Sequence, residues 1–92
     1  MNLLDSSFRP KDGIEAEDAG DEVLIYLPGG DKTLYLNETA AIVWRLCDGV
    51  RTGHEVMELL TEAYPDDAQE VRSQVLAAIE DFIARGIIDS DV

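Results

Sequence analysis

The sequence predicts an α+β fold, in which a three-stranded antiparallel sheet is followed by three helices in a winged helix-turn-helix-like arrangement. Before Asn37, apolar residues occur in β-favouring runs separated by turn residues, whereas after Asn37 they recur at helical spacing. The connections between the expected elements are short, which keeps neighbouring elements in contact. Because a chain of 92 residues holds one hydrophobic core, we expect a single domain over residues 1–92.

A β-hairpin is expected over residues 22–36. Residues 22–27 form a dense β-favouring run, and residues 32–36 alternate polar and apolar side chains. Between them, Pro28-Gly29-Gly30-Asp31 has strong turn chemistry.

A third strand is expected upstream of the hairpin, between residues 8 and 17, where the signal is weaker. Its apolar candidates are Phe8, Ile14 and Ala16. The residues Asp18-Ala19-Gly20-Asp21 are expected to form the connecting turn.

The first helix is expected to begin after Asn37, a preferred N-cap residue, and to stop at Gly49, which readily adopts the left-handed backbone conformation. Its apolar face carries Ala40, Val43, Trp44 and Cys47, with Ile42 and Leu46 beside it. The second helix begins at Thr52 and Glu55, which have capping-box spacing, and ends at Tyr64-Pro65. Its apolar residues are Val56, Leu59, Leu60 and Ala63.

The third helix is expected to start near Asp67 and Glu70 and to close at Gly86. Its apolar stripe consists of Val71, Val75, Leu76, Ile79, Phe82 and Ile83. Ile87 and Ile88 follow as a short apolar tail that is expected to pack back onto the core.

The charge of the chain restricts its partners. Seven Lys and Arg residues against twenty Asp and Glu residues give a formal net charge of -13. This charge repels phosphate backbones, anionic lipids and acidic peptides and favours basic or neutral peptides, so we expect neither a nucleic-acid nor a membrane partner. The single Cys47 fits a reducing compartment, and the chain shows no signal-peptide pattern and no membrane-length apolar run. We therefore expect a cytoplasmic protein.

No catalytic or metal-binding residue is predicted. Cys47 shares the apolar face of its helix with Trp44, where a buried thiol is usually inert. His54 falls in the first turn of a helix, where a solvated side chain is the expected state. One Cys and one His do not make a zinc site without carboxylates, and Gly29-Gly30 precede no helix that would hold a phosphate. We expect neither enzymatic activity nor a cofactor.

The strand over residues 32–36 is the remaining candidate site. An edge strand exposes unpaired backbone donors and acceptors, to which an extended peptide can add as a further strand. Lys32 also permits a second interpretation, because charges on an edge strand protect it from aggregation. The residue pattern leaves both interpretations open.

Residues 34–49, Leu-Tyr-Leu-Asn-Glu-Thr-Ala-Ala-Ile-Val-Trp-Arg-Leu-Cys-Asp-Gly, resemble the PqqD family. This family includes the pyrroloquinoline quinone biosynthesis chaperone and the precursor-recognition elements of ribosomal peptide pathways, among them lasso-peptide leader-binding proteins. The similarity continues through Arg51-Thr52, Tyr64-Pro65 and residues 84–88, and it extends from about Val23 to Ile88.

The resemblance implies a peptide chaperone that does not bind DNA and captures the leader of a precursor peptide as an added strand, between the third strand and the third helix. The peptide-binding residues that it implies are Lys32, Thr33, Leu34, Tyr35 and Leu36 in the strand, and Arg72, Val75, Leu76 and Ile79 on the helix. Arg72 is expected either to pair with a leader carboxylate or to form a surface salt bridge.

The resemblance also implies that chemistry belongs to a partner, which is a radical SAM enzyme in cofactor maturation or a leader protease in lasso-peptide maturation. The sequence does not choose between these pathways. Two other classes remain open. One is a structural accessory subunit, for example a homodimer through the sheet edge. The other is a winged-helix transcriptional regulator, which the acidic second helix disfavours because a recognition helix needs Lys or Arg.

Overall fold

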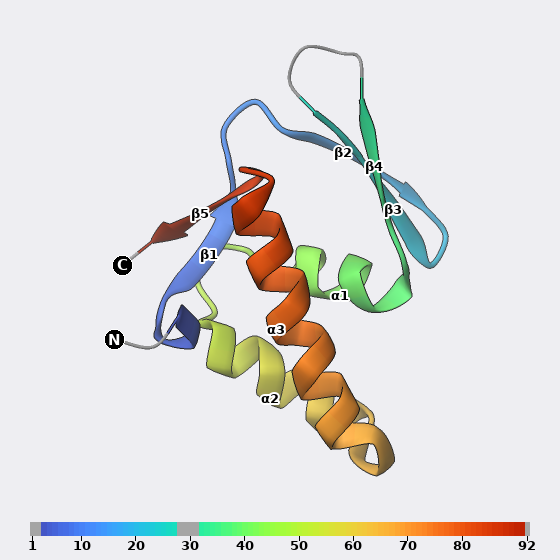
Figure 1. Cartoon of the computed structure of the whole chain (residues 1–92), viewed down its shortest axis with the longest axis vertical. Helices are drawn as coiled ribbons and strands as arrows, with labels where there is room; N and C mark the ends of the chain where they lie inside the picture. Colours follow the sequence, from blue (N-terminus) through green and yellow to red (C-terminus); the bar gives the residue numbers. More distant parts are fainter. Residues whose placement is uncertain (1–2, 28–31, 92) are drawn as a thin grey trace.

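The computed structural model describes residues 3–27 and 32–91, and it contains two small sheets and three α-helices within these ranges (Figure 1). The larger sheet is antiparallel, with the strand order β2 (Glu15–Ala19), β3 (Glu22–Tyr26) and β4 (Thr33–Leu36). The helices follow in the chain as α1 (Glu38–Leu46), α2 (Gly53–Ala63) and α3 (Ala68–Ala84). The expected α+β class, a three-stranded antiparallel sheet followed by three helices, is confirmed.

The smaller sheet was not predicted. It pairs β1 (Ser7–Pro10) with β5 (Ile88–Asp91) in antiparallel orientation, so segments from opposite ends of the chain lie side by side (Figure 1). The buried Ile87 and Ile88 pack onto the core as expected, and Ile88 is also the first residue of β5.

The assignment of Phe8 to the third strand of the larger sheet is therefore wrong. Phe8 lies in β1, and its side chain is buried in the core. The chain turns between the two strands, where Ile14 N–H donates to the Lys11 carbonyl at 3.2 Å and Gly13 has φ of 89°. This turn separates β1 from β2, so that the two strands join different sheets. The expected hairpin turn at residues 28–31 lies outside the described residues.

Local capping sets the helix boundaries. The Asn37 side chain accepts a hydrogen bond from Ala40 N–H at 3.0 Å, and the Thr52–Glu55 capping box is complete. α2 ends before Tyr64, because the following Pro65 disfavours helical backbone at that residue. A short 3-10 helix (Pro65–Asp67) leads into α3, which gives way to a left-handed Gly86 with φ of 72°.

Two contacts position α1 between the larger sheet and α3. Arg45 of α1 bonds Asp18 of β2 at 2.9 Å. Next to Arg45 in the sequence, Trp44 meets Phe82 of α3 edge-on, with 5.9 Å between ring centroids. The largest fully buried side chains connect both sheets to all three helices, and they are Phe8, Val23, Ile25, Val43, Val56, Val75, Ile79, Phe82 and Ile87.

Some members of the expected apolar helix stripes are not covered. Leu59 on α2 and Leu76 and Ile83 on α3 are exposed. Within residues 3–27 and 32–91, no helix has both the length and the apolar character that crossing a bilayer requires.

Candidate functional site

β4 forms one edge of the larger sheet. Within the described part of the chain its strand partner is β3, and its other side carries no paired strand. Leu27 N–H donates to the Lys32 carbonyl at 3.1 Å, just outside the first strand pair. Antiparallel pairing alternates along a strand, so Leu34 and Leu36 bond β3, whereas Thr33 and Tyr35 direct their N–H and C=O groups outward. The open edge therefore presents two sets of backbone donors and acceptors.

The side chains of the predicted strand residues differ in exposure. Leu36 is buried and Leu34 is half-buried, so both contribute to the core side of the sheet. Tyr35 is 57% exposed on the outer face. A hydrogen bond to Glu22 raises the pKa of Tyr35 above its usual 10.0. Lys32 and Thr33 are exposed. This edge therefore offers the exposed side chains of Lys32, Thr33 and Tyr35 as well as the outward backbone groups.

A groove begins where β4 runs into α1 and continues along α3. Its first part, here called the strand-end hollow, has a volume of about 370 Å³. It is lined by Asn37, Thr39 and Ala40 on one wall and by Gln74, Ala77, Ala78 and Asp81 of α3 on the other. Three of these residues are alanines, whose small side chains leave space for the side chains of an added strand.

The structure places the four predicted α3 residues away from this groove. Val75 and Ile79 are fully buried in the core. Arg72 lines a different hollow, on the α2 side of the helix, together with His54, Met57, Glu58 and Thr61. Leu76 follows Arg72 by one helical turn and so lies on the same flank. None of the four lines the strand-end hollow.

Sequence reasoning missed the α3 residues that do line the strand-end hollow. Gln74, Ala77, Ala78 and Asp81 are not among the residues that the family resemblance implied, and none of them belongs to the apolar stripe of the helix. The small Ala77-Ala78 pair was the one available signal, because small side chains allow another chain to approach a helix closely. Asp81 is neutralised by Arg85, with 2.9 Å between the carboxylate and the guanidinium.

The Cys47 thiol is unsuited to nucleophilic chemistry. Cys47 is 2% exposed, and burial, with a smaller effect of the Asp48 charge, raises the pKa of its thiol to about 12. Its thiolate, the nucleophilic form, is therefore scarce at neutral pH. Among the described residues, no three His, Cys, Asp or Glu side chains converge as a metal site would require. The arrangement favours binding of an extended chain.

The family comparison bears directly on this groove. The model for "Coenzyme PQQ synthesis protein D (PqqD)" matches residues 22–88. The chain belongs to the PqqD family. The matched region contains β3, β4 and all three helices, and hence both walls of the groove. The family resemblance found in the sequence, and its extent of about residues 23–88, are confirmed.

A solved structure shares the fold of this PqqD family member. It is described as TbiB1 in complex with the TbiA(beta) leader peptide, and it matches with a TM-score of 0.76 at 13% sequence identity. The match covers 91% of this chain and 98% of the other. No curated protein sequence matches the chain.

Proposed function

We propose that this PqqD family member binds the leader segment of a ribosomally made precursor peptide and presents it to a modifying enzyme. The open edge of β4 beside the α3 groove is the observation that carries the proposal, because an extended peptide needs unpaired backbone groups and space for alternate side chains. Membership of the family and the shared fold with TbiB1, whose structure contains a leader peptide, support it.

In this proposal the leader adds to the sheet as a strand next to β4. Thr33 and Tyr35 exchange backbone hydrogen bonds with it, while Lys32, Leu34 and Leu36 hold β4 to β3. On the helix side, Gln74, Ala77, Ala78 and Asp81 take the place that the sequence assigned to Arg72, Val75, Leu76 and Ile79.

The chain itself performs no chemistry in this proposal. It raises the local concentration of the leader at the enzyme, because a tethered encounter has an effective concentration on the order of millimolar. Its enzyme partner is either a radical SAM enzyme or a leader protease. Residues 1–92 form a single peptide-binding domain, which uses no cofactor and works in the cytoplasm.

Calorimetric or fluorescence-polarisation titration of the full chain tests the proposal, with the leaders of short precursors encoded near its gene as ligands. We expect micromolar or tighter binding to one of them. Failure of every neighbouring leader to bind would contradict the proposal. Light scattering tests the homodimer alternative, since a dimer that persists with saturating leader would count against leader capture at the β4 edge.

A transcriptional regulator is disfavoured by the surface of α2. Glu55, Glu58 and Glu62 of α2 are all exposed, so the helix in the recognition position of a helix-turn-helix presents carboxylates. Such a helix repels the DNA backbone.

A further inference from the structure

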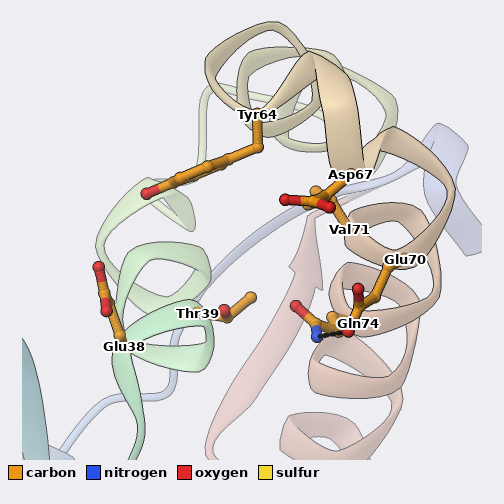
Figure 2. A pocket seen from close by; sticks show the side chains of 7 residues that line it. All are labelled: Glu38, Thr39, Tyr64, Asp67, Glu70, Val71 and Gln74. Carbon is orange, nitrogen blue, oxygen red and sulfur yellow. Dashed lines mark hydrogen bonds between the residues drawn. The ribbon is translucent and has the colours of Figure 1, made fainter.

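The groove continues past the strand-end hollow into a second hollow of about 220 Å³, here called the Tyr64 hollow (Figure 2). It is lined by Glu38, Thr39, Tyr64, Asp67, Glu70, Val71 and Gln74. Thr39 and Gln74 also line the strand-end hollow, so the two hollows share walls. A peptide that leaves the β4 edge along α3 therefore reaches the Tyr64 hollow next.

The Tyr64 hollow has carboxylates on two facing walls, and one of them, that of Glu70, accepts a hydrogen bond from Gln74 Nε2 at 3.3 Å (Figure 2). Glu38 stands on the α1 wall, and Asp67 and Glu70 stand on the α3 wall, with the Asp67 carboxylate directed into the space (Figure 2). No Lys or Arg among residues 3–27 and 32–91 forms an ion pair with any of the three. Asp67 occupies the N-cap position of α3 but makes no capping hydrogen bond. Its carboxylate is therefore available to a ligand.

Tyr64 gives the hollow a face that suits an organic cation. Its side chain is 42% exposed and extends from the end of α2 across the hollow toward the α1 wall (Figure 2). An ammonium or guanidinium group is attracted to the face of an aromatic ring, and its alkyl stem packs on apolar surface. Val71 and the methyl group of Thr39 supply such surface in the same hollow.

A bare metal ion does not fit this lining. Within the described residues, no three or more His, Cys, Asp or Glu side chains are grouped so that they could hold a metal ion, and this includes the carboxylates of the Tyr64 hollow. A Lys or Arg side chain spans a wider space, because its charge lies at the end of a long stem. The net charge of -13 favours the approach of such a cation.

We propose that the Tyr64 hollow holds a Lys or Arg side chain of the bound leader, which selects leaders that carry a basic residue beyond the segment paired with β4. This proposal rests on the proposed function, because the strand edge delivers the peptide to the hollow. It adds a specificity element that the edge itself lacks, since backbone pairing accepts many sequences.

Peptide selection followed by a double-mutant cycle tests the proposal. A random linear peptide display library is selected on the full chain, and an enriched peptide is resynthesised with each Lys or Arg replaced by Gln. Both peptides are then titrated against the wild type and against the acidic-hollow variant, which carries Glu38→Gln, Asp67→Asn and Glu70→Gln. We expect a roughly tenfold loss of affinity from either change and little additional loss from both.

A charge-matched variant controls for long-range attraction. It carries Asp12→Asn, Glu15→Gln and Glu80→Gln, three exposed positions that line neither hollow. It has the same net charge as the acidic-hollow variant, and we expect its affinity for the basic peptide to stay near that of the wild type. Thermal melts verify that both variants fold.

The outcomes separate this proposal from the proposed function. Enriched peptides without a common Lys or Arg, or a basic preference that survives in the acidic-hollow variant, would overturn the Tyr64 hollow proposal and leave strand addition standing. An equal loss in the charge-matched variant would also overturn it, because the effect would then be long-range. If no peptide is enriched on the wild type, both proposals fail.

Discussion

Proline substitutions along β4 distinguish the residues whose backbone N–H groups face outward from those whose N–H groups bond β3. The Leu27–Lys32 hydrogen bond sets the alternation, so Thr33 N–H faces outward and Leu34 N–H bonds Ile25 of β3. Proline removes one backbone donor and is tolerated at sheet edges. Thr33→Pro should therefore affect the bound peptide and spare the fold, whereas Leu34→Pro should damage the fold.

The expected magnitudes differ between the two variants. A single backbone hydrogen bond contributes about 0.5–1.5 kcal/mol, so Thr33→Pro should weaken leader binding about two- to twelvefold. Leu34→Pro leaves the Ile25 carbonyl without its partner, which costs about 1–3 kcal/mol of unfolding free energy. In a domain of this size, that corresponds to roughly 4–8 °C in Tm for each kcal/mol.

Fluorescence polarisation with a labelled leader measures the affinities, and thermal melts followed by circular dichroism measure stability. Tyr35→Pro should behave like Thr33→Pro, with Tyr35→Phe as its control, because phenylalanine keeps the backbone donor and removes only the hydrogen bond to Glu22. Unchanged affinity in both outward-facing proline variants, with Tm near that of the wild type, would refute the assignment of the β4 edge as the binding site.

Three further predictions concern the scaffold. Gly53→Ala should destabilise the fold by about 1–3 kcal/mol, because the added Cβ would lie 2.8 Å from Leu4 Cδ2 and 2.9 Å from Leu4 Cα. Thermal melts measure this, and a Tm at or above that of the wild type would contradict the packing of Gly53 against Leu4. Cys47 should react slowly with a thiol reagent in mildly alkaline buffer and rapidly in denaturant, because burial raises its pKa to about 12; equal rates would show an accessible thiol. Backbone hydrogen bonds from Val50 and then Arg51 lower the pKa of Asp48 from its usual 3.8. The stabilisation that they give is therefore present above pH 3.8 and is lost as the pH falls through the lowered pKa. The Tm difference between wild type and Asp48→Asn should therefore be largest near neutrality and shrink in acid, and a difference independent of pH would exclude this linkage.

The elements predicted best from the sequence are those with strong local signals. The Asn37 cap, the Thr52–Glu55 capping box and the Tyr64-Pro65 stop are all local hydrogen-bonding or steric effects, and each is found where it was expected. The β1–β5 pair was missed because its strands lie at opposite ends of the chain. Pairing at such a distance has no local sequence pattern.

The candidate site was predictable only in part, because the strand edge follows from the order of elements along the chain but the helix wall does not. The edge strand follows from chain order, since β4 ends the hairpin and leads directly into α1. The orientation of α3 does not follow, because an apolar stripe identifies the core-facing side of a helix and leaves open which flank borders the sheet. The family resemblance implied Val75 and Ile79, which belong to the apolar stripe and are buried in the core, whereas the strand-end hollow lies on the flank of Ala77 and Ala78.

Amide hydrogen exchange along β4, followed by NMR with and without a bound leader, tests strand addition most directly. In the free chain, the amide of Leu34 should exchange slowly, because it is bonded to β3, and the amides of Thr33 and Tyr35 should exchange rapidly. At saturating leader, Thr33 and Tyr35 should become protected while Leu34 changes little. Protection that appears instead along β2 or β5, with Thr33 and Tyr35 still exchanging rapidly, would contradict leader capture at β4.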